Sequence, residues 1–259
     1  MPGPVPTSCL LGTVLLLACA VAAEPAPRVA IIVDDLGYQL AAGERALRLP
    51  GPVSYAVLPQ TPRGPALARL AASRGRDVLL HLPLQPVGEH GNDEPGGISL
   101  DMSRLQFRGV FERDLASVPQ AIGINNHRGS LLTRHPGHMS WLMQELGPRG
   151  LIFVDSYTTH HSVALQIARE NGIPATRRDV FLDANPTPAA IAAEFRRLKR
   201  LARARGSAIA IAHPYPVTLQ FLESELPSLA DEGYRLVGIG ELLGAGAGAG
   251  PQADRTGDR

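Results

Sequence analysis

The chain has 259 residues, of which 44% are hydrophobic and 19% charged. This is the composition of an ordinary globular protein with one large domain or two small ones, and it excludes a collagen-like or wholly disordered chain. The net charge of +1 gives no reason to expect nucleic acid or an acidic membrane surface as a partner.

The first 23 residues differ from the rest of the chain. The stretch LLGTVLLLACAVAA at 10–23 is apolar, ends in small residues and is too short to span a bilayer comfortably. It predicts a signal peptide over residues 1–23 with cleavage near Ala22 or Ala23, although no Lys or Arg precedes it. Lipidation at Cys19 is the first alternative and an uncleaved anchor the second. We therefore expect a periplasmic or secreted protein with no membrane span after signal removal.

Both cysteines of the chain, Cys9 and Cys19, lie within this leader. The remaining chain has no cysteine and no disulfide, which a domain of this size does not need. Any metal site in it must therefore use His, Asp or Glu, because no thiolate is present.

Short apolar strands and helical stretches alternate between residues 28 and 243. The predicted strands lie at 29–33, 53–58, 77–82, 120–124, 151–154, 207–212 and 235–239. The predicted helices lie at 39–48, 64–74, 109–118, 137–146, 162–171, 187–205 and 217–231. Apolar strands separated by helices predict one α/β domain with a parallel sheet. Seven such units are enough to close a barrel, and an open sheet is the alternative.

Three segments depart from this alternation. Residues 85–107 are rich in Gly and Pro and predict a long loop, which in a compact domain is often functional. The basic run RRLKRLARAR at 196–205 has apolar residues at helical spacing, so we interpret it as the solvated face of a helix, with phosphate binding as the alternative. The Gly- and Ala-rich end at 244–259 predicts a disordered tail without catalytic content.

Five of the seven predicted strands end in a carboxylate or an imidazole. In a parallel α/β fold the carboxyl ends of the strands meet at one edge, so residues far apart in sequence converge there. Each residue alone is typical of a helix cap or a hydrogen-bonded core group, but the set together predicts a functional site. Its members are Asp34, Asp35, His81, Asn125, Asn126, His127, Asp155 and His213.

One aspartate and two histidines can form a facial metal site that leaves positions open for water and substrate. The adjacent Asp34 and Asp35 suit such a site if one binds the metal and the other faces the attacking water, because a cation relieves their mutual repulsion. An imidazole on the far side would protonate the leaving group.

Seven segments in order along residues 29–222 resemble the divergent polysaccharide deacetylase family, a branch of the NodB-like carbohydrate esterases. They are VAIIVDDLGY, VSYAVLPQTP, DVLLHLPLQP, GINNHRGSLLT, FVDSYTT, SVALQIARENGIPATRRDVFLD and AIAIAHPYPVTLQFL. GINNHRGS and RRDVFLD are the most specific. The resemblance implies a distorted seven-stranded (β/α) barrel over residues 28–243. It also implies a metal-dependent hydrolase that removes N- or O-acetyl groups from sugars.

The resemblance also assigns expected roles by position. Asp34 matches the catalytic base and Asp35 the first metal ligand. His81 matches the first histidine of a His-x-x-x-His ligand motif. His213 matches the late strand-end histidine that acts as the general acid.

The sequence departs from the family at the second histidine ligand. Four residues after His81 stands Gln85, whose amide is a poor ligand for zinc. We predict that His127 supplies the missing imidazole and that Asp35, His81 and His127 bind a divalent metal, with zinc expected. The departure leaves the identity of the metal, its affinity and catalytic competence open.

Four polar residues at or near the strand ends are predicted to contact substrate, and two of them belong to the set above. Arginine guanidinium and asparagine amide groups suit a carbonyl or oxyanion, and the alternative is that these side chains anchor loops or pair with Asp179 or Asp183. The predicted substrate contacts are Asn126, Arg128, Asp155 and Arg178.

The other histidines, such as His90 and His135, are interpreted as solvated or capping residues, with His160 or His161 lining the cleft as an alternative. Strand-end tyrosines, among them Tyr38, suit either stacking on a sugar ring or closing the barrel.

The sequence therefore favours an enzyme that acts on an acetylated glycan of the cell envelope or the extracellular space. The alternative from another class is a non-catalytic envelope protein that keeps the fold and binds a glycan or a partner. A metal-dependent hydrolase of a non-sugar amide would use the same residues.

Overall fold

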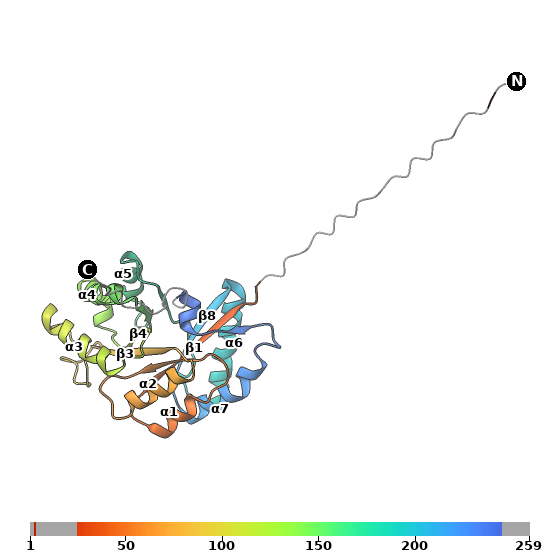
Figure 1. Ribbon diagram of the computed structural model, residues 1–259, viewed down its shortest axis with the longest axis horizontal. Helices are drawn as coiled ribbons and strands as arrows, with labels where there is room; N and C mark the ends of the chain where they lie inside the picture. The colour runs from red at the N-terminus through yellow and green to blue at the C-terminus, as the bar shows by residue number, and fades with distance from the viewer. Residues whose placement is uncertain (1–2, 4–24, 245–259) are drawn as a thin grey trace, which may run out of the picture.

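The computed structural model describes residue 3 and residues 25–244, and Figure 1 shows strands in the middle of the fold with helices around them. The predicted signal peptide and tail lie outside the described residues, apart from Gly3 and Gly244. None of the helices in the described part of the chain combines the length and apolar character that crossing a membrane requires.

The described residues form one nine-stranded sheet in which every paired strand is parallel to its neighbour. The strands are β1 Arg28–Leu36, β2 Ser54–Val57, β3 Val78–Leu84, β4 Gly123–Arg128, β5 Ile152–Asp155, β6 Ala175–Arg177, β7 Val180–Phe181, β8 Ser207–Ala212 and β9 Arg235–Leu236.

Helices follow most of these strands, as expected for parallel connections. They are α1 Leu40–Ala46, α2 Gly64–Ser73, α3 Arg104–Ser117, α4 Pro136–Leu146, α5 Ala164–Glu170, α6 Pro188–Arg205, α7 Pro216–Glu225 and α8 Ile239–Leu243. Short 3₁₀ turns lie at η1 Leu132–Arg134, η2 Gly147–Arg149 and η3 Leu226–Ser228.

The sheet curls into a distorted barrel. Its strand order is β6-β5-β4-β3-β2-β1-β8-β7, and β9 pairs with β1 outside this path. β6 and β7 lie next to each other in sequence, separated by Arg178 and Asp179. The Arg178 amide donates to Asp155 O on β5, and the Asp179 amide donates to Ile209 O on β8. Residues 175–181 thus join both ends of the sheet. If β6 and β7 count as one interrupted strand, the path around the barrel has seven strands. The predicted α/β fold with a distorted seven-stranded barrel is thus confirmed.

Side chains alternate between two apolar clusters, as the two-residue period of a strand requires. Val29, Ile31 and Val33 of β1 belong to the larger cluster, which includes the buried faces of the helices. Ala30 and Ile32 belong to a smaller cluster built mainly from strand residues, which fills the barrel interior. The parity of a residue in its strand therefore decides whether it faces the helices or the interior.

Two strands of the structure were not predicted, and two predicted strands differ in their bounds. β6 and β7, with three and two residues, are too short to give an alternation pattern and were not predicted. The predicted strand at 235–239 is shorter, because β9 covers only Arg235–Leu236 and α8 begins at Ile239. The predicted strand at 120–124 lies further along the chain, at Gly123–Arg128.

α3 begins at Arg104, five residues before the predicted helix at 109–118. Ser103 and Gln106 form a capping box: Ser103 Oγ accepts from the Gln106 amide, and Gln106 Oε1 accepts from the Ser103 amide at 2.8 Å. This box satisfies two amides that the first helical turn leaves unpaired. The loop predicted at 85–107 therefore ends at Ser103.

The Asp114 carboxylate of α3 packs beneath this loop. It is buried, Gln60 Nε2 donates to its Oδ1 at 2.7 Å, and its Oδ2 has no hydrogen-bond partner. A side chain at Gly96 would collide with it, so the loop backbone lies directly against the carboxylate. Burial raises the pKa of Asp114 to about 7, although Gln60 and Arg113 act to lower it.

This raised pKa predicts a pH-dependent effect of Asp114→Asn on stability. The pKa in the folded protein exceeds the ordinary value of 3.8. The wild type therefore loses free energy of unfolding as pH rises from about 4 to about 7, while the amide does not titrate. We expect the variant to be more stable by on the order of 2 kcal/mol at about pH 8 and close to the wild type at about pH 4, as measured by urea unfolding. A stability difference that does not change with pH would contradict this account.

Candidate active site

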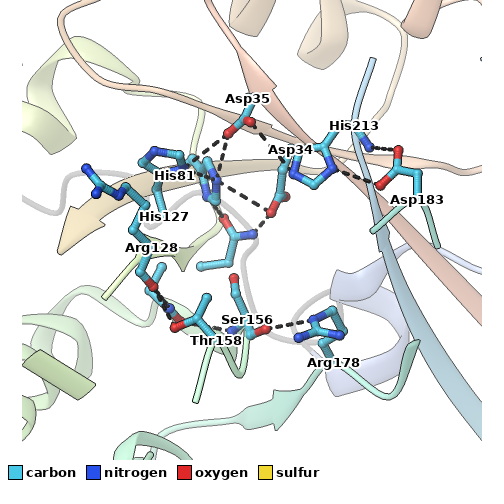
Figure 2. Close-up of polar contacts among 12 residues, drawn as sticks. Asp34, Asp35, His81, His127, Arg128, Ser156, Thr158, Arg178, Asp183 and His213 are labelled. Carbon is cyan, nitrogen blue, oxygen red and sulfur yellow. Dashed lines mark hydrogen bonds and ion pairs between the residues drawn. The ribbon is translucent and has the colours of Figure 1, made fainter. Parts of the chain in front are cut away.

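The barrel brings five of the predicted site side chains together at the carboxyl ends of its strands. Figure 2 shows them around one point, with contacts that link residues from β1, β3, β4 and the end of β8. The group consists of Asp34, Asp35, His81, His127 and His213.

Strand parity explains four of these five placements. Asp34 stands two residues after Ile32, which faces the barrel interior, and therefore faces the interior as well. The same spacing relates Leu79 to His81 on β3, Asn125 to His127 on β4 and Ile211 to His213 at the end of β8.

Asp35 requires a different explanation, because consecutive residues of a regular strand face opposite sides. Its backbone is left-handed, with φ of 60°, and the pairing of β1 with β2 shifts register between Val33 and Leu36. Leu36 consequently packs in the outer cluster although it follows Asp34 by two residues. This local irregularity, a type of feature common beside active sites, turns Asp35 toward the same side of the strand as Asp34.

Three side-chain atoms form a nearly equilateral triangle. Asp35 Oδ1 lies 3.2 Å from His81 Nε2 and 3.2 Å from His127 Nδ1, and the two nitrogens are 3.2 Å apart. Ligand atoms about 2.0–2.2 Å from a zinc ion and on one side of it lie about 3.0–3.4 Å from each other. Asp35 Oδ1 is also buried and receives no hydrogen bond of acceptable geometry from these neighbours. The triangle can therefore hold a divalent metal ion.

Asn125 links His81 to Asp34. Its Oδ1 lies 2.9 Å from His81 Nδ1, and its Nδ2 donates to Asp34 Oδ1 at 2.8 Å. Because the amide oxygen only accepts, the proton of His81 sits on Nδ1 and leaves Nε2 free to face the triangle. From the sequence, Asn125 is predicted at a strand end but has no predicted role.

Asp183, between β7 and α6, holds His213 in a similar way. Its Oδ1 accepts from His213 Nδ1 at 2.9 Å, and its Oδ2 accepts from the His213 amide and from Thr218 Oγ1. His213 Nε2 is then directed toward Asp35 Oδ2, 3.7 Å away. From the sequence, Asp183 is expected only as an arginine partner, because no local pattern connects residues 30 positions apart.

Burial and the neighbouring charges shift the pKa values of three groups in this site. Burial raises the pKa of Asp34, although His81 and His213 act to lower it. Burial also acts to raise the pKa of Asp35, but the adjacent His127 and His81 imidazoles outweigh it and hold this pKa far below its usual value. Burial acts to lower the pKa of His81, yet the two aspartates raise it to about 9. The two carboxylates thus require a positive charge between them, from a histidine proton or a cation.

A cavity of about 490 Å³ opens beside the triangle. Asp35, His127 and His213 lie on its wall, and Tyr38 and Tyr215 stand at it with 55% and 44% of their surface exposed. The Tyr215 ring stacks on the His213 ring, with centroids 5.4 Å apart. Most of the remaining wall is apolar: Leu36, Ala42, Leu58, Pro59, Pro83, Pro95, Pro214 and Pro216.

Asn126, Asp155 and Arg178 lie outside this group. Asn126 Oδ1 accepts from the Ser156 amide, Asp155 Oδ1 accepts from the Tyr157 amide, and Arg178 donates to the carbonyls of Ser156 and Tyr157. Figure 2 shows Arg178 and Ser156 below the histidine cluster. These bonds hold the turn after β5, and direct contact of these three residues with substrate stays a prediction.

Gln85, at the expected position of a second ligand histidine, is turned into the long loop. Its Nε2 donates to Glu89 O and its Oε1 accepts from the Leu100 amide, each at 2.8 Å. Arg128, the remaining predicted substrate contact, pairs with the carboxylates of Glu89 and Glu94 from the same loop. The second imidazole of the triangle thus comes from β4, while the Gln85 side chain forms hydrogen bonds with the loop backbone.

Residues 31–243 match the sequence model of a family described as divergent polysaccharide deacetylase. An uncharacterized protein from Haemophilus influenzae is 39% identical over 215 residues, which cover 83% of this chain and 76% of that protein. The crystal structure of an uncharacterized protein from Agrobacterium tumefaciens C58 is similar with a TM-score of 0.81 and 26% identity, covering 85% of this chain and 91% of that one.

Two other solved structures show similarity of fold alone. One is the catalytic domain of a peptidoglycan N-acetylglucosamine deacetylase from Eubacterium rectale, with a TM-score of 0.55, 14% identity and coverage of 84% of this chain and 90% of that one. The other is a CE4 family pseudoenzyme from Bacillus anthracis, with a TM-score of 0.50, 15% identity and coverage of 84% and 66%.

The triangle predicts that His127→Ala weakens zinc binding. The variant keeps only two of the three donor atoms, so we expect zinc affinity, measured by competition with a chromophoric chelator, to fall at least about 100-fold. His160→Ala is the matched control, because that imidazole is exposed and does not belong to the triangle. Wild-type affinity in the His127 variant would show that zinc binds elsewhere.

Proposed function

The chain belongs to the divergent polysaccharide deacetylase family, and we propose that it is a metal-dependent hydrolase that removes acetyl groups from a glycan of the cell envelope or the extracellular space. The observation that carries this proposal is the convergence of two carboxylates and three imidazoles beside one cavity. A periplasmic or secreted location follows from the apolar leader and is part of the proposal.

Asp35, His81 and His127 would hold the metal, with zinc as the expected ion. They offer one carboxylate and two imidazoles on one side of a shared point, a donor set that suits zinc and leaves positions open. A divalent cation there supplies Lewis acidity, which polarises a carbonyl oxygen and acidifies water in contact with it.

Asp34 is the proposed general base. Its Oδ1 is fixed by Asn125, while its Oδ2 lies 3.5 Å from His81 Nε2 and so borders the triangle. Burial raises the pKa of the carboxylate and makes it a stronger base than an exposed aspartate. It takes a proton from the water that attacks the acetyl carbonyl.

His213 is the proposed general acid. Asp183 binds Nδ1–H, so the proton that leaves the ring is the one on Nε2, which faces the cavity. Burial acts to lower the pKa of His213, but the hydrogen bond to Asp183 raises it above its usual value and favours the protonated ring. Nε2 gives its proton to the departing nitrogen or oxygen. Asp34 gains one proton as His213 loses one, so their summed charge is unchanged.

The walls of the cavity suit a sugar ring. A volume of about 490 Å³ lies within the usual range for small-ligand sites. Exposed Tyr38 and Tyr215 present flat faces on which the apolar face of a ring can stack. The stack of Tyr215 on His213 would bring such a ring next to the proposed acid.

A non-catalytic envelope protein that binds a glycan or a partner is the second candidate. Gln85 favours this candidate, because it stands at the position where the family resemblance predicts a ligand histidine and holds a loop instead. The fold is compatible with this loss, since a CE4 family pseudoenzyme shares it. Elemental analysis of protein purified without added metal separates the two: stoichiometric zinc favours the enzyme. Absence of metal, with a melting temperature that does not respond to chelator, favours the binder.

Asp34→Asn tests the proposed chemistry. Because the amide cannot accept a proton from water, we expect kcat for release of acetate from acetylated chito-oligosaccharide to fall at least about 100-fold. Asp34 lies outside the triangle, so the zinc content should stay at the wild-type level. Wild-type protein stripped with chelator and reloaded with zinc serves as the control for recovery of activity. Full activity in the variant would remove Asp34 as the base.

A further inference from the structure

The loop between β3 and α3 contributes Glu94, a residue without a role in the proposed chemistry. We propose that Glu94 positions His127 as a metal ligand: its carboxylate binds Nε2–H of the ring and thereby keeps Nδ1 free to face Asp35 and His81. The proposal rests on the proposed metal site and does not depend on which substrate is hydrolysed.

The contacts assign both nitrogens of the His127 ring. Glu94 Oε2 lies 3.1 Å and Oε1 lies 3.3 Å from His127 Nε2. A carboxylate only accepts, so Nε2 carries the proton. Nδ1 lies 3.2 Å from both Asp35 Oδ1 and His81 Nε2. Asp35 Oδ1 receives no hydrogen bond of acceptable geometry, so Nδ1 presents its lone pair to the triangle. A carboxylate behind a metal-binding imidazole fixes the tautomer and raises the basicity of the ligand nitrogen.

The two imidazoles of the triangle are held by different means. His81 is buried and receives its partner, Asn125, from the neighbouring strand β4. His127 lies at the rim, with 20% of its side chain exposed, and receives its partner from a loop. Glu94 can serve His127 only if this loop has a fixed conformation.

Gln85 provides the main anchor of the loop. Its side chain bridges the Glu89 carbonyl and the Leu100 amide, which lie in the first and the last part of the loop. The backbone amide of Gln85 donates to Ile98 O, and the backbone amide of Ile98 donates to Pro83 O near the end of β3. The residue that stands where the family resemblance predicts a ligand histidine therefore holds the loop that supports the replacement histidine.

Arg128 fixes the carboxylate of Glu94 beside Nε2 of His127. Its Nη1 donates to Glu94 Oε1 at 3.1 Å, and its other guanidinium nitrogen binds Glu89. Consecutive residues of a regular strand face opposite sides, but Arg128 has a left-handed backbone with φ of 55°. This conformation lets His127 and Arg128 both reach Glu94.

Zinc affinity of three full-length variants tests the proposal. We expect Glu94→Ala to weaken zinc binding about 10- to 100-fold, because the ring is no longer held in one tautomer. Glu94→Gln keeps an acceptor oxygen and should restore part of the loss. Glu89→Gln removes the other carboxylate paired with Arg128 and should stay within about twofold of the wild type. Wild-type affinity in folded Glu94→Ala protein would overturn the proposal.

The tautomer itself supplies a readout that a general loss of structure would not reproduce. In long-range ¹H–¹⁵N spectra of zinc-free protein, wild-type His127 should carry its proton on Nε2, and the Nδ1–H form should appear in Glu94→Ala. An unchanged tautomer in that variant counts against the proposal even if affinity falls. A wild type that binds no zinc overturns the proposed metal site as well, and this outcome is distinct from a failure confined to Glu94.

Discussion

The break in β1 at Asp35 is the constraint on which the rest of the site depends. Asp35 contacts His81, His127 and His213, which come from three other strands. A regular strand would direct it toward the helices, away from all three. The left-handed backbone is unfavourable for most residues but is tolerated by aspartate, and the barrel around it holds it in place. Without that turn, Asp34 would be the only carboxylate of β1 on the side of the three histidines.

Each imidazole of the site has one nitrogen bound by a protein acceptor and the other directed toward the Asp35 carboxylate. The acceptors are Asn125 for His81, Asp183 for His213 and Glu94 for His127. They come from a strand, from the segment after β7 and from a loop, so no single element carries the arrangement. In a site with little water, such contacts fix proton positions before a ligand arrives and reduce the reorganisation that chemistry would require.

The sequence predicted the architecture well where the elements are long. Apolar runs that end in polar residues predicted β1, β3, β5 and β8, and they also predicted that the carboxyl ends of these strands converge. It missed β6 and β7, which are too short to carry a periodic pattern and exist because the chain crosses from β5 to β8 there. The capping box at Ser103 and Gln106 is visible in the sequence and would have placed the start of α3 correctly.

The sequence by itself determined which residues stand at or just after the strand ends and so predicted that Asp34, His81, His127 and His213 meet at one edge of the sheet. Only the tertiary structure decided that a left-handed turn brings Asp35 to their side, that Gln85 and Arg178 hold loops, and that Glu94 meets His127. The reason is physical. Side-chain parity is a local property of the backbone, whereas a register shift and a contact across 33 residues depend on how distant segments pack.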